Sequence, residues 1–195
     1  MAFQLPDDLA PEAYPLAWLI GRWRGPGFVA YPDIPQRGVL VDVEFGHDGG
    51  PYLTYRCTTH LLESPLESLE GDIDVAALQA GQVWSAESGY WRVAPTDAGT
   101  DGKGNGTPDG GVPAHALEVL LAEPSGHVNV YLGQVQGPRV ELSTDLIART
   151  STGADIAAAA RMYGLVRGEL MWATDLAAFG HELQSYSSGR LQRHE

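Results

Sequence analysis

The second half of the chain, from residue 115 onward, is a succession of short apolar and β-branched runs separated by turn signals. Such runs, at intervals of about 8–12 residues, are typical of an all-β barrel or sandwich made of consecutive hairpins. Similar alternating runs occur before residue 95, so the sequence predicts about ten strands in all. After the first strand, the predicted strands span residues 38–47, 52–61, 82–93, 117–122, 128–135, 139–147, 157–166, 169–176 and 181–193.

The first predicted strand carries glycine or tryptophan at alternate positions, namely Gly21, Trp23, Gly25 and Gly27. Alternate residues of a strand point to the same face, so one face shows a large indole between glycines. Glycine within a strand allows a bend or the close approach of another backbone, and Pro32 then ends regular pairing. The stretch predicts the opening strand of a closed or strongly curved sheet. We therefore expect a single antiparallel β-barrel.

The length of 195 residues fits one domain, residues 1–195, with a sizeable core. Residues 1–18 contain three prolines and several apolar side chains. We expect them to form short helical turns that cap an end of the barrel. Residues 96–114 are rich in glycine and show no apolar period, which predicts a flexible loop.

The formal net charge of −13 argues against nucleic acid or an anionic membrane surface as the main partner. The lone cysteine, Cys57, excludes a disulfide within the chain and fits a small buried side chain. No apolar run is long enough to span a membrane, so we expect no membrane insertion. The N-terminus lacks the basic start and apolar core of a signal peptide, and a cytoplasmic location is expected.

The GxWxGxG pattern of the first strand, followed by a Tyr-Pro pair, resembles the signature of the nitrobindins. Residues 87–92 are similar to a second segment of that family, E-x-G-[FY]-W-R. The resemblance covers most of residues 16–193, except for residues 62–80 and 96–114. It implies a small barrel like those of the fatty-acid-binding proteins, with a hydrophobic interior that takes one apolar ligand. In many nitrobindins this ligand is heme.

The last predicted strand covers the segment that holds the heme iron in the nitrobindins it resembles. Heme-binding members of that family share the motif L-x-x-H-L-x-A-x-L-x-R, and its His is the iron ligand. When this segment is laid on Leu183 and Leu191-x-Arg193 without a gap, the His position falls on Tyr186. The resemblance thus implies that the proximal His is replaced by Tyr186. His181 lies five residues earlier, on the opposite face of a regular strand, and reaches the site only through a bulge or a shifted strand.

Arg161 and Tyr163 lie on one face of a late predicted strand. In fatty-acid-binding proteins an Arg-x-Tyr pair grips the ligand carboxylate, because the guanidinium forks onto the carboxylate and the phenol adds a donor. The opposite parity would instead turn Met162, Gly164 and Val166 inward and leave Arg161 in water. The histidines show no metal-ligand spacing and no catalytic constellation is visible, so we predict neither catalytic residues nor a metal site.

These observations favour a non-catalytic barrel that binds a small hydrophobic, fatty-acid-like molecule in its lumen and needs no cofactor. The alternative is a ferric heme protein acting on nitric oxide or peroxynitrite, which the family resemblance implies, with Tyr186 in place of the His ligand. A third interpretation is a partner-binding module that uses residues 1–18 or 96–114. The sequence also leaves open whether the chain forms a homodimer. The predicted ligand-binding residues are Gly21, Trp23, Gly25, Gly27, Arg161, Tyr163 and Tyr186.

Overall fold

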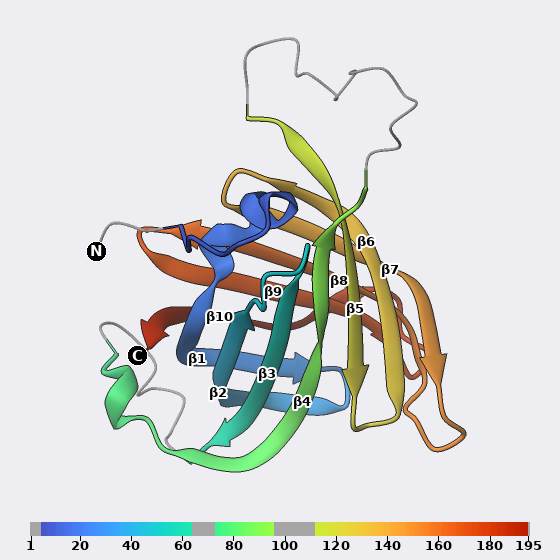
Figure 1. Cartoon of the computed structure of the whole chain (residues 1–195). Coiled ribbons are helices and arrows are strands. Elements are labelled where there is room, and N and C mark those ends of the chain that lie inside the picture. Colours follow the sequence, from blue (N-terminus) through green and yellow to red (C-terminus); the bar gives the residue numbers. More distant parts are fainter. Residues whose placement is uncertain (1–4, 64–72, 96–111, 195) are drawn as a thin grey trace.

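Ten antiparallel strands close into one barrel in the computed structural model, which describes residues 5–63, 73–95 and 112–194 (Figure 1). The strands follow chain order around the barrel, and β1 pairs with β10 to close it. The predicted all-β antiparallel barrel of about ten strands is therefore confirmed. The strands are β1 (Gly21–Tyr31), β2 (Ile34–Gly46), β3 (Leu53–Leu62), β4 (Ala80–Val93), β5 (Ala114–Glu123), β6 (His127–Gln136), β7 (Arg139–Arg149), β8 (Ile156–Val166), β9 (Glu169–Ala178) and β10 (Gln184–His194).

The hydrophobic core lies inside the barrel and follows from the period of two along each strand. In β2, the alternate residues Val39, Val41, Val43 and Phe45 are all buried, whereas Glu44 between them is exposed. Burying such apolar side chains contributes about 1.5–3 kcal/mol each. This alternation fixes the register of β2, because a slip by one residue would turn the whole set toward water.

Glycines at the junction of β1 and β10 let the two backbones come close enough to close the barrel. A Cβ atom on Gly25 would lie 2.2 Å from the carbonyl oxygen of Arg190, and one on Gly27 would lie 2.6 Å from that of Ser188. Across the junction, a Cβ on Gly189 would lie 2.6 Å from a carbonyl oxygen of β1. These positions exclude any side chain, which explains the glycine spacing of the opening strand.

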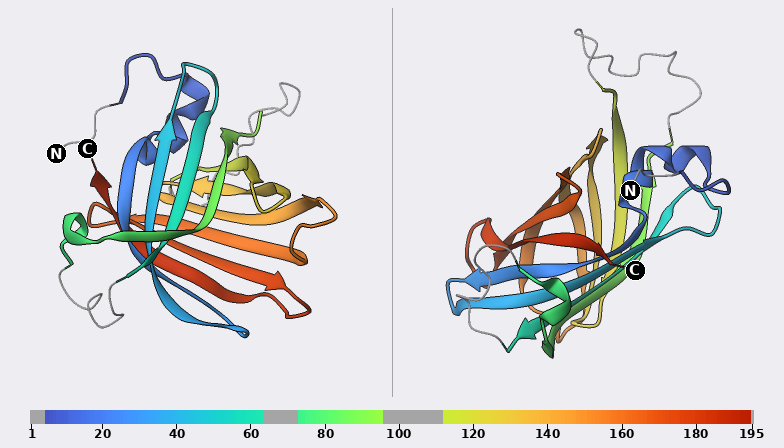
Figure 2. Two further views of the ribbon diagram at one scale, coloured as in Figure 1. Left: turned by 90° about the horizontal axis from the view of Figure 1, so that it is seen from below. Right: turned by 90° about the vertical axis from the view of Figure 1, so that its left-hand side faces the viewer.

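One short 3₁₀ helix, η1 (Pro11–Leu19), precedes the barrel and buries one side of its surface in the core. The indole N–H of Trp23 donates to the Leu19 carbonyl at 2.7 Å, and Arg193 donates to the Ile20 carbonyl at 2.7 Å. Figure 2 shows η1 beside the turn between β2 and β3. The prediction of short helical turns at the N-terminus is confirmed. Whether residues 1–18 act as a cap stays a prediction, and residues 1–4 lie outside the described part.

The two segments that the family resemblance leaves out, residues 62–80 and 96–114, lie partly outside the described residues. Of the predicted loop 96–114, residues 96–111 are not described, and β5 already begins at Ala114. A second short 3₁₀ helix, η3 (Val75–Ala77), precedes β4, and the Asp74 carboxylate accepts a hydrogen bond from the Ala76 N–H at its start. Among the described residues, no helix has the length and apolar character needed to cross a membrane.

Candidate ligand site in the barrel lumen

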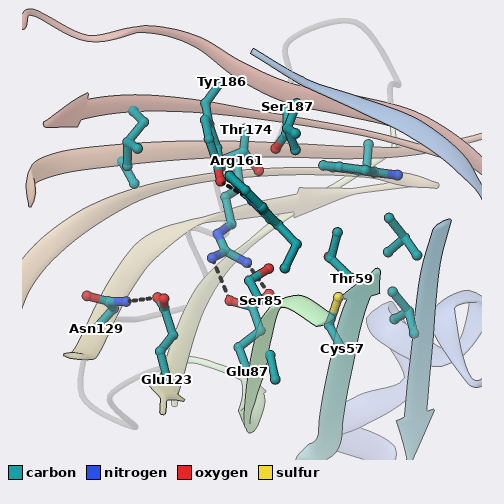
Figure 3. Close-up of a pocket in the computed structure, with 18 of the residues that line it drawn as sticks. Cys57, Thr59, Ser85, Glu87, Glu123, Asn129, Arg161, Thr174, Tyr186 and Ser187 are labelled. Atoms are coloured by element: carbon teal, nitrogen blue, oxygen red, sulfur yellow. Dashed lines mark hydrogen bonds and ion pairs between the residues drawn. The ribbon is translucent and has the colours of Figure 1, made fainter. Parts of the chain in front are cut away.

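The lumen of the barrel holds a cavity of about 170 Å³ (Figure 3). Side chains from β1 to β10 turn inward to line it, since alternate residues of every strand face the interior. One part of the wall is apolar and the remainder carries charged and polar groups. The apolar part includes Val29, Val41, Val43, Ile147, Ile156 and Leu176, and the polar part includes Glu87, Glu123, Asn129, Arg161, Tyr163 and Tyr186.

A buried ion pair reaches across the polar part of the lumen. The Arg161 guanidinium donates two hydrogen bonds to the Glu87 carboxylate, at 2.6 and 2.7 Å, and the side chains are only 10% and 13% exposed. The Tyr55 hydroxyl donates a further bond to Glu87 at 2.7 Å. Burial alone raises the pKa of Glu87, but the Arg161 charge and these hydrogen bonds outweigh it and hold the pKa below its ordinary value. Glu87 is therefore ionised at neutral pH.

The predicted grip of Arg161 and Tyr163 on a carboxylate takes an unexpected form. Both residues line the cavity, while Met162 and Val166 are about half exposed on the outside, so the inward parity is the one found. The carboxylate that Arg161 holds is that of Glu87, 74 positions away in the chain. The arginine is neutralised by the protein itself, so a ligand carboxylate would have to compete with a bidentate, buried partner.

A second carboxyl group, Glu123, lines the lumen at the end of β5 and belongs to a chain of hydrogen bonds. It accepts hydrogen bonds from the Asn129 amide at 2.7 Å and from the Ser125 hydroxyl at 3.2 Å. Ser125 also contacts His127, whose other ring nitrogen lies 2.9 Å from a backbone carbonyl. Burial and the nearby Glu87 charge raise the pKa of Glu123. The two lumen carboxyl groups are thus shifted in opposite directions, because only Glu87 has a cation as its close partner.

Tyr186 points into the cavity from β10, on the side opposite Glu87 (Figure 3). Its hydroxyl oxygen accepts a hydrogen bond from the indole N–H of Trp84 at 2.7 Å, across a separation of 102 residues in the chain. Burial raises the pKa of Tyr186 and the Trp84 N–H partly offsets this effect. Nothing in the sequence pairs Trp84 with Tyr186, so this contact could not be predicted.

The lumen contains two kinds of side chain that hold heme iron in other proteins, a tyrosine and a cysteine. All six histidines belong to the described residues, and none of them lines the cavity. His181 lies just before β10, where its ring meets Tyr31 edge to face at 5.7 Å. Cys57 lines the cavity as a buried thiol, and burial raises its pKa to about 12, so it stays protonated at neutral pH. Within the described part of the chain, no three His, Cys, Asp or Glu side chains gather as a metal site.

The predicted ligand-binding residues fall into two groups. Three of them, Arg161, Tyr163 and Tyr186, surround the cavity. The four residues of the opening motif do not line it but lie where β1 meets β10 and the N-terminal segment. The signal that sequence reasoning missed is Glu87, which stands in the segment of residues 87–92. Its partner could not be identified, because pairing across 74 residues depends on the closed barrel.

The closed barrel, its apolar wall and its buried polar cluster place the chain in the class of β-barrel proteins that have a ligand-sized cavity in the lumen. Residues 12–193 match the family described as "THAP4-like, heme-binding beta-barrel domain". The chain therefore belongs to this family, the nitrobindins.

Two relatives and one solved structure resemble the chain along nearly its whole length. A "Ferric nitrobindin-like protein" of Beutenbergia cavernae is 60% identical and covers 99% of both chains. A "Peroxynitrite isomerase" of Kocuria rhizophila is 36% identical and covers 100% of this chain and 97% of its own. The crystal structure of Rv2717c from M. tuberculosis has a TM-score of 0.71 at 28% identity and covers 96% of this chain and 99% of that one.

These comparisons overturn three predictions: a non-catalytic binder as the main function, the absence of an enzyme activity, and the absence of a cofactor. The family is a heme-binding one, and several relatives of this chain are peroxynitrite isomerases by name. The predictions failed because they gave one position, Tyr186, more weight than the rest of the chain. A porphyrin is held mainly by apolar contacts, and iron also accepts a phenolate ligand, so a tyrosine at that position is no sign of a missing cofactor.

Proposed function

We propose that this protein binds ferric heme in the barrel lumen, with the Tyr186 oxygen as the protein ligand of the iron, and acts on peroxynitrite. The observation that carries the proposal is the position of Tyr186. Its hydroxyl lies in the lumen, and the family resemblance of the last strand implies that this position corresponds to the iron-binding His of heme-containing nitrobindins. Support for the activity comes from the name and near-complete coverage of the relative from Kocuria rhizophila.

The lumen fits the chemistry of an iron porphyrin. Its apolar wall offers contacts to the macrocycle, and tyrosine is an established ligand of ferric heme iron. The free volume of about 170 Å³ is smaller than the roughly 300–1,000 Å³ of pockets that enclose ligands of drug size. Heme is at least that large, so side chains that cross the lumen have to move when it binds.

When bound, ferric heme supplies a Lewis-acidic iron that attracts a small anion such as peroxynitrite. The chain's own residues control the surroundings of that anion. Arg161 is neutralised by Glu87, so it does not add an unpaired positive charge to the lumen. Glu123 is the lumen carboxyl whose pKa is raised. When the negatively charged peroxynitrite enters the lumen, Glu123 takes up a proton more readily than an ordinary glutamate. The apolar wall excludes water from the site.

The test is reconstitution of the purified protein with hemin, followed by absorption spectroscopy and stopped-flow measurement of peroxynitrite decay. We expect a saturable Soret band with one heme per chain and faster decay of peroxynitrite than with free hemin. Tyr186→Phe should weaken heme binding and abolish the charge-transfer absorption of an iron phenolate. Tyr186→His should restore tight binding with the spectrum of an imidazole ligand.

Two results would contradict parts of the proposal. If no saturable Soret band appears at any hemin concentration, heme binding is wrong. If Tyr186→Phe leaves the band and the affinity unchanged, heme binds but Tyr186 is not its ligand. Tyr163→Phe is the matched control, because it removes a phenol from the same lumen and leaves Tyr186 untouched.

A further inference from the structure

The two residues that meet across the lumen, Trp84 and Tyr186, both lie at β-bulges. On β4, Ser85 pairs with Thr59 and Val83 pairs with His60, so Trp84 between them has no partner on β3. A β-bulge bends its strand and re-aims the side chain of the extra residue, and bulges are frequent beside active sites. Trp84 is therefore turned out of the regular alternation of β4 and takes its place in the cavity lining.

The same irregularity occurs on β10. Ser185 pairs with Asp175 and Ser187 pairs with Thr174, which leaves Tyr186 as the extra residue. Two independent bulges, on strands that are not neighbours in the barrel, thus aim two side chains at each other. The result is the 2.7 Å hydrogen bond from the Trp84 indole to the Tyr186 hydroxyl.

This hydrogen bond uses the oxygen on which the proposed heme site depends. The indole N–H is a donor only, so the Tyr186 oxygen is the acceptor. The ring of Trp84 also occupies part of a lumen whose remaining free volume, about 170 Å³, is too small for a porphyrin. Trp84 therefore competes with a lumen ligand twice, for the phenol oxygen and for space.

We propose that Trp84 is the specificity-determining residue of the lumen, and that a large ligand binds only when it displaces the Trp84 ring from Tyr186. For heme this rests on the proposed function, but the displacement applies to any bulky apolar ligand. The observed affinity is then the intrinsic affinity reduced by the fraction of molecules in which Trp84 has moved away. Substitutions of Trp84 itself should tighten binding, because they free the Tyr186 oxygen and leave it in place. If the Trp84 ring instead supported the ligand, the same substitutions would weaken binding.

The experiment measures the affinity of two probes, hemin and the fluorescent dye anilinonaphthalene sulfonate, for three variants and the parent protein. Trp84→Phe removes the hydrogen bond and keeps most of the ring, and we expect affinity to rise roughly 2- to 10-fold, the equivalent of one net hydrogen bond. Trp84→Ala removes the bulk as well and should give the larger gain. Trp172→Phe is the matched control, since Trp172 also lines the cavity but its indole N–H has no hydrogen-bond partner among the described residues. It should change affinity less than 2-fold.

A third readout needs no bound probe. In the ligand-free protein, Tyr186→Phe should shift one indole N–H signal in the NMR spectrum, which Trp84→Phe identifies as that of Trp84. If dye affinity rises as expected while hemin fails to bind any variant, the displacement holds and the heme proposal is wrong. If hemin binds but both Trp84 variants bind hemin and dye no more tightly than the parent, Trp84 does not restrict the lumen. The displacement is equally excluded if the indole signals do not respond to Tyr186→Phe.

Discussion

Glu87→Gln provides the sharpest test of how the lumen is held together. The substitution keeps the shape of the side chain and removes its charge, so Arg161 remains buried without a counter-ion. The two side chains are 13% and 10% exposed and share two short hydrogen bonds. Breaking a buried pair from one side costs about 3–5 kcal/mol. We expect a loss of that size in the free energy of unfolding at pH 7, measured by urea denaturation with fluorescence and circular dichroism.

The pH dependence of that loss has a definite sign. The pKa of Glu87 is lowered from its ordinary value of 4.5 in the folded protein. Its stabilising contribution is therefore fully present above about pH 4.5 and disappears as the pH falls through the lowered folded pKa. The difference between the parent and Glu87→Gln should be constant near neutral pH and shrink in acid.

Two comparisons make the reasoning refutable. Glu44→Gln breaks an exposed pair with Arg22, whose side chain is 65% exposed, and should cost less than about 1 kcal/mol. The double variant Glu87→Gln, Arg161→Met removes both charges and should be less destabilised than the sum of the two single variants. A loss below about 1 kcal/mol for Glu87→Gln, or strict additivity in the double variant, would refute the view that the pair is desolvated and coupled.

Four further substitutions test other parts of the barrel by thermal unfolding. Gly89→Ala would place a Cβ 1.8 Å from a carbonyl oxygen of β5 and should lower the free energy of unfolding by at least about 1–3 kcal/mol. Gly164→Ala should be tolerated, because the nearest atom to its Cβ would lie 3.8 Å away. Glu123→Gln should raise the stability at neutral pH but not below about pH 4.5, because a raised folded pKa means that ionisation costs folding free energy. Trp23→Phe should cost about 1–3 kcal/mol by leaving a buried carbonyl without its donor. If the Tm of Gly89→Ala, of Trp23→Phe or, at neutral pH, of Glu123→Gln is unchanged, the prediction for that variant is wrong.

Much of the barrel could be predicted, because strand position depends on local patterns. The predicted strand over residues 38–47 puts Val39, Val41 and Val43 on one face, and all three side chains are buried. The predicted strands 157–166 and 169–176 leave only Arg167 and Gly168 between them, which indicates a hairpin with a tight turn. Both residues have the positive φ that such a turn requires. Strand ends differ from the predictions by a few residues, since pairing with a neighbour extends a strand beyond its own signal.

The candidate site could be predicted only in part. Arg161, Tyr163 and Tyr186 were identified and line the cavity, but their partners were not. Glu87 and Trp84 come from β4, and each lies more than 70 positions away from its partner among these residues, Arg161 or Tyr186. Hydrogen bonds of this kind depend on which strands face each other across the lumen and on bulges that reverse the local parity, and neither appears in a sequence pattern.

The sequence by itself determined the class of fold and the family, and it identified three of the residues that line the lumen, Arg161, Tyr163 and Tyr186. Period-two alternation and glycine spacing act locally, and the match over residues 12–193 depends on sequence alone. Only the tertiary structure decided what those residues do in the lumen. It gave the arginine an internal carboxylate as its partner and covered the Tyr186 oxygen with the indole of Trp84. The physical reason is that burial, charge pairing and free volume are properties of the closed barrel, and each depends on residues far apart in the chain.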